Sequence, residues 1–414
     1  MVYEKSNLRK MRTTALLLAL SVPVGSAIAL RAERTPTAAP EPVVAAGATM
    51  LLGAVAAPVA MDSAPLRKAR ARVESEVERG AFPGAALAVG RGARLALIEG
   101  VGTPDWGSGK VDPERTVYDI ASLTKVVATT TALMLLVEDG KVELDAPVSR
   151  YLPAFSGGEK DRVTLRHLLA HTSGLPAWSP ARGATPDAAL EDVVRTPLTA
   201  LPGSRMEYSD VGFVVLWAAA ERAAGEPLPE LLERRVWGPL GMTSTGFNPG
   251  AGCERCSPTW RKEGAPVRGV VHDPIARKLG GVAGNAGLFS TAGDLSRFAA
   301  MLASGGELQG ARVLKEETIR DFAVRQPGAG ERALGWETPK ENGTGAAGKS
   351  LSSRAFGHTG FTGTSLWVDP ERRTWTVLLT NRTYDPRTSS RIQQLRRAVH
   401  AYVTQSADLA AFAE

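Results

Sequence analysis

The sequence predicts an α+β fold in which one antiparallel sheet is assembled from both ends of a single domain. Short strand pairs stand at both ends, at 85–98 and 365–380, and charged, helix-like segments lie outside them, at 65–79 and 389–402. Between the strand pairs the chain has the pattern of helices joined by Pro/Gly-rich loops. We therefore expect a sheet flanked by helices, an α/β sandwich, with a mostly helical inserted subdomain at about 121–281.

Each strand pair is predicted from a run of β-prone residues interrupted by a turn. The first pair, Ala85–Ile98, turns at Gly90-Arg-Gly92. The second pair, Ser365–Thr380, turns at Asp369-Pro-Glu-Arg372. Both runs therefore predict antiparallel hairpins.

The helices are predicted from apolar spacing and from capping residues. Pro65–Arg79 and Ser389–Tyr402 are amphipathic, and Val211–Ala224 is apolar with Gly225 where a helix ends. Shorter helices are predicted at Val163–Ala170, at Leu228–Val236, and on the stretch to Leu302 that Thr291 and Asp294 cap.

Composition and charge exclude some classes of partner. The 414 residues are 43% hydrophobic and 22% charged, which is ordinary for a globular protein. The net charge is +6, and half of it comes from residues 1–29. The remaining arginines are scattered, without a basic stripe or interleaved aromatic residues, so no nucleic-acid partner is expected.

The N-terminus has the pattern of an export signal. A basic segment, Arg9–Arg12, precedes the uncharged stretch Thr13–Leu30, and Ala27-Ile-Ala29 offers a small-x-small cleavage site. No cysteine follows that site, which argues against a lipoprotein anchor. We expect residues 1–29 to be a signal peptide and the protein to be exported, periplasmic or secreted.

A second uncharged run, Val43–Met61, follows the predicted signal. It is of nearly membrane-spanning length but is rich in alanine and contains glycine and proline. We interpret residues 30–63 as an Ala/Pro-rich linker, with an N-terminal membrane tether as the alternative. The folded domain is then expected at 64–404, followed by a tail at 405–414.

Three patterns are similar to parts of metal or cofactor sites, and each lacks residues that such a site needs. Cys253 and Cys256 lack two further soft ligands, so they predict either a loop disulfide or two free thiols. His167 and His171 have the i, i+4 spacing of zinc ligands, but the glutamate of the zinc-protease motif is missing. The glycine-rich loop Gly280–Gly287 lacks the residues of a nucleotide site. We expect no metal and no cofactor, and a metallohydrolase stays a minor alternative.

The stretch that carries the chemistry is Asp119–Lys125. Ser122 and Lys125 are three residues apart, which on a helix places both side chains on one face. The run Val126–Val137 has no charge and Gly140 follows it, so the helix is expected to be buried. A capping serine and a solvated lysine would give the same pattern. Because an idle buried lysine is costly, we favour a serine nucleophile with a lysine base whose pKa burial lowers.

Two further patterns complete a constellation. Tyr208-Ser-Asp210 precedes a helix, and His358-Thr-Gly360 opens a strand. In this order with Ser-x-x-Lys, they resemble the serine β-lactamase and penicillin-binding protein superfamily, over roughly 65–400. The resemblance is strongest to its class C-like serine hydrolases, which include carboxylesterases and D-amino-acid peptidases. Segments also similar to that group are His171–Leu175, Leu279–Gly284, Gly287–Ser290 and Gly357–Gly363.

The resemblance implies a role for each residue. Ser122 would attack the acyl carbon, and Lys125 and Tyr208 would share the proton transfers. The backbone N–H groups of Ser122 and Phe361 would form the oxyanion hole. The residues that would orient Lys125 and the substrate are Asp210, His358, Thr359 and Gly360.

Several of these residues also have an ordinary structural interpretation. Tyr208 could be a core tyrosine, and Asp210 could cap the following helix. Phe361, Trp178 and Trp336 would line an acyl pocket, although core packing is equally expected for the two tryptophans.

Two departures from the family pattern affect the expected substrate. Asp210 replaces an asparagine, and its negative charge should raise the pKa of Lys125. His358 replaces a lysine and is a cation only part of the time near neutral pH. We predict that activity rises above neutral pH and that esters react fastest. Penicillins and peptides ending in free D-Ala should be recognised weakly.

The leading hypothesis is a serine hydrolase that forms an acyl-enzyme with a small ester or amide, or with a cell-wall peptide. A class C-type β-lactamase, or a D-Ala-D-Ala carboxypeptidase, is the alternative. A non-catalytic cell-wall-binding relative is a minor one. An α/β-hydrolase mechanism is excluded because the chain has no Gly-x-Ser-x-Gly motif.

Overall fold

The computed structural model describes residues 59–107, 109–384 and 391–411, which all belong to one compact unit at 48–414. The predicted signal peptide at 1–29 lies outside the described residues. The predicted linker and the uncharged run at 43–61 lie outside them as far as Pro58. Both therefore stay predictions.

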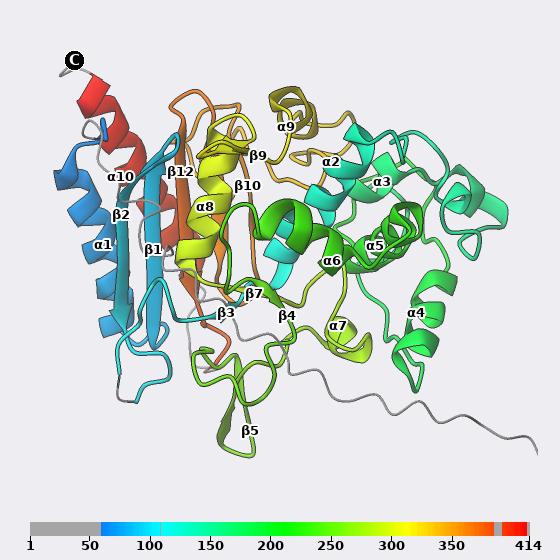
Figure 1. Ribbon diagram of the computed structural model, residues 1–414, viewed down its shortest axis with the longest axis horizontal. Coiled ribbons are helices and arrows are strands. Elements are labelled where there is room, and N and C mark those ends of the chain that lie inside the picture. The colour runs from blue at the N-terminus through cyan, green and yellow to red at the C-terminus, as the bar shows by residue number, and fades with distance from the viewer. Residues whose placement is uncertain (1–58, 108, 385–390, 412–414) are drawn as a thin grey trace, which may run out of the picture. The chain divides into compact units, whose positions relative to one another are not determined.

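One five-stranded antiparallel sheet joins the two ends of the domain, as predicted. Its strand order is β10-β11-β12-β1-β2, and β1 pairs with β12 so that Ala85 lies opposite Thr380 (Figure 1). Both expected hairpins are confirmed, as β1–β2 and β11–β12. The strand bounds are Gly84–Arg91 (β1), Arg94–Gly102 (β2), Phe356–Thr359 (β10), Ser365–Asp369 (β11) and Thr374–Thr380 (β12).

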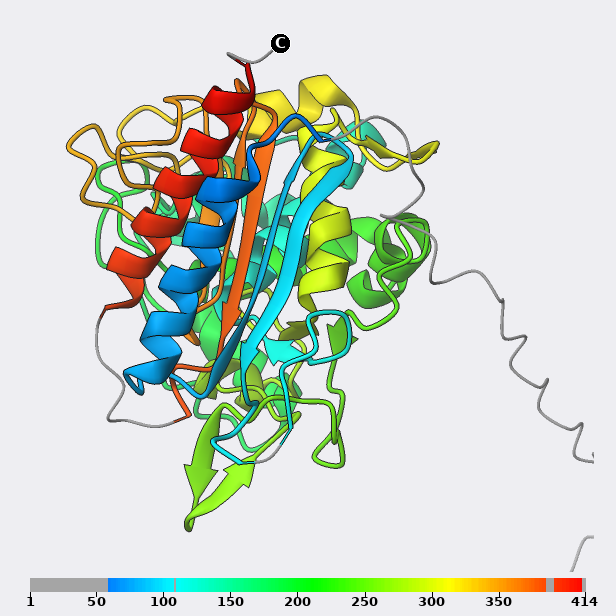
Figure 2. The ribbon, with the colours of Figure 1, turned by 90° about the vertical axis from the view of Figure 1, so that its left-hand side faces the viewer.

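Helices cover both faces of the sheet. The terminal helices α1, Ser63–Glu78, and α10, Ile392–Ala411, lie side by side over one face, and α8, Ala292–Ala303, lies on the other (Figure 2). The α1–α10 layer is held by an apolar cluster in which Leu66 and Val73 are buried with Val399. Burial of such side chains on both faces explains why the strands are themselves largely apolar.

Helix α10 continues past residue 404, where the domain was expected to end. Its last turns are not a tail, because Val403 and Ala407 are buried against the core. Asp62 also donates its N–H to the carbonyl oxygen of Ser406 at 3.0 Å, which ties this turn to the start of α1.

The insertion is mostly helical and also contains a small sheet, β3-β7-β4, whose strand β3 comes just before the turn that carries Ser122 (Figure 1). The helices between the two strand pairs, besides α8, are α2 (Thr131–Glu138), α3 (Leu165–Leu169), α4 (Pro186–Arg195), α5 (Asp210–Ala224), α6 (Leu228–Leu232), α7 (Pro274–Lys278) and α9 (Glu316–Phe322). The short strands are β3 (Tyr118–Asp119), β4 (Gly246–Phe247), β5 (Trp260–Lys262), β6 (Ala265–Val267), β7 (Leu288–Ser290), β8 (Glu307–Leu308) and β9 (Ala311–Arg312).

The predicted buried helix after Ser122 is present, but it is not one regular α-helix. A 3₁₀ turn, Ala121–Leu123, leads through π-helical residues Lys125–Thr130 into α2. In the described part of the chain, Ala121–Glu138 is the one segment apolar and long enough to cross a membrane, and 83% of it is buried inside the domain. It is therefore the central core helix.

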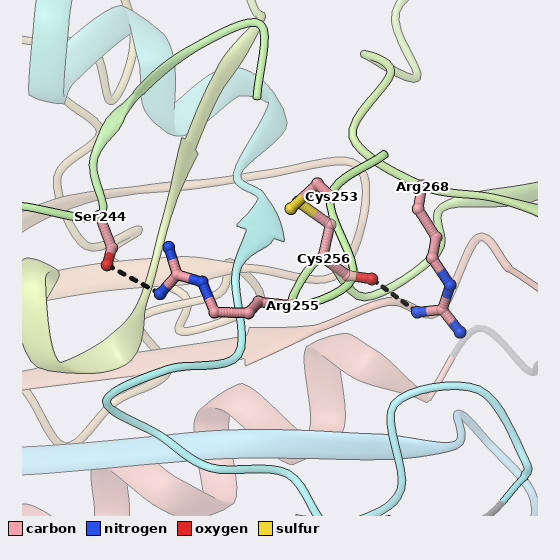
Figure 3. The surroundings of a disulfide bond; sticks show 5 residues. All are labelled: Ser244, Cys253, Arg255, Cys256 and Arg268. Carbon is pink, nitrogen blue, oxygen red and sulfur yellow. Dashed lines mark hydrogen bonds between the residues drawn. A yellow bond between two sulfur atoms is a disulfide. The ribbon is translucent and has the colours of Figure 1, made fainter. Parts of the chain in front are cut away.

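Cys253 and Cys256 form a disulfide, which decides between the two interpretations of the pair (Figure 3). The loop that it closes lies beside the chain that leads to Ser122, since Cys256 forms a parallel bridge with Val117, one residue before β3. Arg268 donates to the carbonyl oxygen of Cys256 at 2.6 Å. The disulfide thus braces the chain that leads to Ser122.

Candidate active site

Ser122 and Lys125 face each other as their spacing predicts. Lys125 Nζ donates to Ser122 Oγ at 3.1 Å, to Asp210 Oδ1 at 2.6 Å and to the carbonyl oxygen of Asn285 at 2.9 Å. The lysine is completely buried. Three acceptors use all three protons of an ammonium group, so this arrangement describes the charged form of Lys125.

Asp210 sets the charge state of Lys125. Burial on its own would lower the pKa of Lys125, but the nearby Asp210 carboxylate and Tyr208 hydroxyl outweigh it, and the pKa is raised. Nζ also lies 4.9 Å from the centroid of the Tyr208 ring. The pKa of Lys125 is therefore raised, as the Asp210 charge led us to expect, and not lowered, as burial alone would predict.

The segment before Ser122 is held by a buried carboxylate. Asp119 accepts the N–H groups of Ala121 at 2.8 Å and His272 at 2.7 Å. Burial raises the pKa of Asp119 to about 6, although both hydrogen bonds oppose this. Ala121 has φ +48°, a left-handed conformation that a non-glycine residue adopts only when its surroundings enforce it. The turn that presents Ser122 is thus fixed by its neighbours.

The turn after β10 also holds this segment. Thr362 Oγ1 donates to the carbonyl oxygen of Asp119 at 2.7 Å, and Thr364 Oγ1 donates to that of Ile120 at 3.0 Å. A Cβ on Gly360 would lie 2.5 Å from the Ile120 carbonyl oxygen, so only glycine allows this close approach. Gly360 therefore allows the end of β10 to pack closely against the turn that carries Ser122.

Tyr208 and Asp210 enter the site from the start of α5. The helix is capped by Ser209, whose Oγ accepts the N–H of Gly212 at 2.9 Å. Asp210 is not the cap, and its carboxylate is directed to Lys125 instead. Tyr208 is half-buried beside Lys125 and is not a core tyrosine.

His171 supports this segment from behind, although its sequence position gave it no catalytic role. Its Nδ1 accepts the N–H of Ser209 at 3.0 Å, and its ring lies 4.5 Å from that of Tyr208. The side chain is buried and the residue has φ +58°. Burial, followed by the charges of Arg332 and Lys125, places the pKa of His171 well below its usual value.

His358 lies on β10, but its ring is neutral near neutral pH, whereas the sequence led us to expect that it is protonated part of the time. Burial is the main cause that brings the pKa of His358 well below its usual value, and the Arg332 and Lys125 charges add to it. The neutral ring donates from Nδ1 to the carbonyl oxygen of Thr359 at 2.9 Å and accepts from Arg332 at Nε2, 3.4 Å away. It therefore holds Arg332, whereas Asp210 orients Lys125.

A cavity of about 290 Å³ opens in front of Ser122. Tyr208, His358 and the Thr359–Phe361 segment line it, so the three sequence patterns meet at one place. Phe361 is 61% exposed at its mouth, with its ring 5.5 Å from that of His272. Of the three aromatic residues expected in an acyl pocket, only Phe361 lies here.

The two tryptophans do not line this cavity, and only Trp336 follows the alternative expectation of core packing. Trp336 is fully buried, with its ring edge-on to Phe356 at 5.0 Å, and belongs to the core. Trp178 is 53% exposed, and it does not line the cavity that contains Ser122.

Three arginines in the same cavity were not found by sequence reasoning: Arg332, Arg382 and Arg396. Arg332 lies over the Tyr208 ring at 5.0 Å and has Glu337 at 3.9 Å. No local pattern marks these arginines, because they come from three separate segments. Only the fold brings them to Ser122.

Arg396 is the most unusual of the three because it is almost completely buried. It donates to the carbonyl oxygens of Gly360 at 3.1 Å and Thr364 at 2.6 Å. The pKa of Arg396 is lowered to about 9, mainly by burial, so the side chain stays charged at neutral pH. Its Nε has no partner, and no carboxylate of the described residues lies within ion-pairing distance.

The two histidines of the metal alternative have structural contacts. His167 Nδ1 accepts the N–H of Thr164 at 3.2 Å, as part of a capping box, and His171 accepts that of Ser209. Within the described ranges, no group of three His, Cys, Asp or Glu side chains is arranged to bind a metal ion.

Comparisons with known proteins agree with this geometry. The β-lactamase family model matches residues 69–400. An Escherichia coli K12 protein named "Putative D-alanyl-D-alanine carboxypeptidase" is 33% identical over 312 residues, which cover 66% of this chain and 70% of that protein. A Salmonella schwarzengrund protein of the same name is 30% identical over 381 residues, covering 79% of this chain and 85% of that protein.

Solved structures share the fold. EstCE1, a hydrolase with promiscuous acyltransferase activity, has a TM-score of 0.67 at 24% identity and covers 82% of this chain and 99% of its own. A penicillin-binding protein homologue from Caulobacter crescentus has a TM-score of 0.68 at 20% identity, covering 83% and 98%. On the evidence of the family match and the relatives, the chain belongs to the β-lactamase family and is a serine hydrolase of the serine β-lactamase and penicillin-binding protein superfamily.

Proposed function

We propose that the protein hydrolyses, through a covalent acyl-enzyme, a short peptide-like ester or amide that ends in a free carboxylate. The observation that carries this proposal is the set of arginines in the cavity of Ser122. A buried cation without a carboxylate partner is costly unless a ligand supplies the opposite charge. Arg396 has this property, and an arginine fork suits a carboxylate particularly well.

This proposal changes one argument based on the sequence. The replacement of a lysine by His358 suggested weak recognition of carboxylates, since a neutral imidazole is a poor anchor. Arg332, which His358 orients, places a permanent cation in the same cavity. The D-amino-acid or cell-wall peptide type of hydrolase is therefore favoured over a hydrolase for neutral substrates. The names of the two bacterial relatives point to the same class.

Acylation would follow from the observed contacts. Ser122 Oγ forms a bond to the acyl carbon and transfers its proton to Lys125 in its neutral form, or to Tyr208 in its phenolate form. The carbonyl π electrons move to oxygen, which the N–H groups of Ser122 and Phe361 stabilise. Collapse of this intermediate breaks the bond to the leaving group, which takes up the transferred proton. Water then attacks the acyl-enzyme by the same steps and releases the acid.

The decisive experiment uses a matched pair of substrates. We expect an acyl-D-Ala-D-lactate ester with a free carboxylate to have a kcat/KM at least tenfold higher than its carboxamide form. A p-nitrophenyl ester, a D-Ala-D-Ala peptide and a chromogenic cephalosporin complete the panel. Equal kcat/KM for the free acid and the carboxamide would refute recognition of the carboxylate. Absence of turnover and of labelling by an active-site phosphonate would refute the hydrolase itself.

A carboxylesterase is the second candidate, and the Lys125–Asp210 contact favours it. A base whose pKa is raised is less often free to accept a proton at neutral pH. Activated esters tolerate this better than amides, because their leaving groups need less protonation. We therefore expect esters to react fastest in the panel. A cephalosporin that reacts faster than the p-nitrophenyl ester would favour a β-lactamase instead.

We also propose that the protein is exported, on the basis of the basic and uncharged segments before Leu30. N-terminal sequencing of the protein from a secreting host should give a start near Leu30. Recovery of the uncut chain in the cytoplasmic fraction would contradict export. Carbonate washing of membranes would distinguish the two interpretations of residues 43–61. A linker predicts that the processed chain is released, and a membrane tether predicts that it stays in the membrane fraction.

A further inference from the structure

A second and larger cavity, of about 510 Å³, lies at the end of the sheet away from Ser122. It is enclosed by the end of α8, by α9, by the start of β10 and by the β11–β12 turn. That turn and the turn at 360–364 stand at opposite ends of β11, so the two cavities are separate. They have no lining residue in common. The volume is in the range typical of small-molecule sites.

The floor of this second cavity is apolar. Leu302, Ile319 and Phe356 form it with most of their surface buried, and Ala323 and Val324 continue it toward solvent. Val324 is 54% exposed, which makes it one of the few large apolar side chains that the described surface presents to water. A ligand with an apolar body would cover this surface and gain the free energy of its burial.

The rim of the cavity is cationic. Four arginines line it, together with one acidic residue, Glu316. Two of them, Arg354 and Arg373, are exposed and have no carboxylate partner among the described residues. The other two are partly engaged: Arg320 with Asp321 at 3.2 Å, and Arg325 with the carbonyl oxygen of Pro339 at 2.7 Å.

The apolar floor and the cationic rim together fit one kind of molecule, which has an apolar body and an anionic end.

We propose that this cavity binds a small anionic amphiphile, with its apolar chain on the Leu302–Phe356 floor and its carboxylate or phosphate head between Arg354 and Arg373. The site is independent of the hydrolase reaction, because neither arginine contacts the catalytic cavity. A bidentate arginine contact suits both head groups, and the apolar floor excludes a free inorganic anion as the preferred ligand.

The test is calorimetric titration of the protein with octanoate, octyl phosphate and 1-octanol below their aggregation concentrations. We expect one saturable site for at least one of the anions and at least tenfold weaker binding of octanol. Acetate and inorganic phosphate, which have the head groups without the chain, should also bind at least tenfold more weakly. Binding of octanol as tight as that of both anions, or no saturable binding of either anion, would overturn the proposal.

Variants locate the site. Arg354→Ala/Arg373→Ala should weaken anion binding at least tenfold, whereas the matched surface double variant Arg115→Ala/Arg222→Ala should leave it unchanged. Ala323→Phe, which fills the apolar part, should also weaken binding. Arg332→Gln tests whether the amphiphile binds in the catalytic cavity instead. This variant should bind the amphiphile as the wild type does. Undiminished binding by the Arg354/Arg373 variant, or loss of binding in Arg332→Gln, would refute the assignment.

Discussion

The two walls of the catalytic cavity differ in how their charges are balanced. The helical wall, which carries Ser122, Lys125 and Asp210, contains a buried cation with a carboxylate 2.6 Å away. The other wall, called the sheet wall, is formed by the end of β10 and the start of α10. It carries His358 and Arg396, and here a neutral imidazole lies near a buried guanidinium without a carboxylate partner. The buried cation of the helical wall is thus neutralised by a carboxylate, whereas the buried cation of the sheet wall is not.

This difference indicates that the two walls have different functions. A paired lysine in contact with a hydroxyl is suited to proton transfer, because small changes in the pair alter which group holds the proton. An unpaired arginine cannot lose its proton at neutral pH and so acts only as a fixed positive charge. We infer that the helical wall performs the chemistry while the sheet wall selects the substrate. Changes in the first wall should alter kcat, and changes in the second should alter KM.

The largest expected effect is the removal of the nucleophile from the helical wall. Ser122→Ala should lower kcat by on the order of 10⁴-fold or more, and Lys125→Ala should be similarly severe. Because nucleophile and base act as one unit, the double variant should be little worse than either single variant. The measurement is steady-state hydrolysis of a p-nitrophenyl ester, with the exposed Ser204→Ala as control. Multiplicative losses in the double variant would show that the two residues do not share a step.

The contrast between the walls also explains which parts of the site the sequence could predict. Ser122 and Lys125 are three residues apart, so their spacing identified them, whereas Tyr208 and His358 lie in short patterns that the resemblance to the superfamily identified. The three arginines come from segments with no common pattern, and only the folded chain brings the loop after α9, the segment after β12 and helix α10 to one cavity. Local chemistry was therefore predictable, whereas the charge of the sheet wall was not.

The fold shows the same limit. Hairpins and amphipathic terminal helices follow from residue periodicity, and the five-stranded sheet and helices α1 and α10 confirmed them. The π-helical turns at Lys125–Thr130 could not be predicted from periodicity, because an apolar run has the same composition whichever type of helix it forms. Burial of Trp336 and neutrality of His358 depend on neighbours far away in the sequence. Tertiary surroundings decide these properties.

His171 tests whether the helical wall depends on support from behind. His171→Asn keeps an acceptor for the Ser209 N–H and tolerates a positive φ, so kcat should fall less than fivefold. His171→Gly relieves the conformation but loses the acceptor, and His171→Leu loses both. We expect kcat to fall about tenfold for the glycine variant and about 100-fold for the leucine variant, with KM nearly constant.

Comparison of these three variants at equal folded fraction, checked by circular dichroism, separates positioning from stability. A purely structural histidine would leave kcat per folded molecule unchanged in all three. Equal losses in the asparagine and leucine variants would show that neither the hydrogen bond nor the conformation matters.

The sheet wall should respond in the opposite way. Arg332→Gln removes a permanent cation from the cavity, so KM for a substrate with a free carboxylate should rise at least tenfold more than KM for its carboxamide form. Arg332→Lys should recover part of the difference, because it restores the charge without the planar fork. The ratio of the two KM values is the measurement. An equal change for both substrates would mean that Arg332 acts through His358 or Tyr208 and not on the substrate.

The smallest expected effect is a shift in pH dependence, and it tests the charge balance of the helical wall directly. Lys125 must be neutral to accept a proton, and Asp210 raises its pKa, so kcat/KM of the wild type should increase with pH above neutrality. Asp210→Asn removes the opposing charge and leaves burial as the main influence, which lowers the pKa. The rising limb should therefore move to lower pH by about one unit or more, equivalent to a tenfold larger neutral fraction of Lys125 on that limb. The profile is measured with a neutral p-nitrophenyl ester, so that the sheet wall does not contribute. A limb at the same pH in the variant would show that a group other than Lys125, with Tyr208 the first candidate, accepts the proton of Ser122.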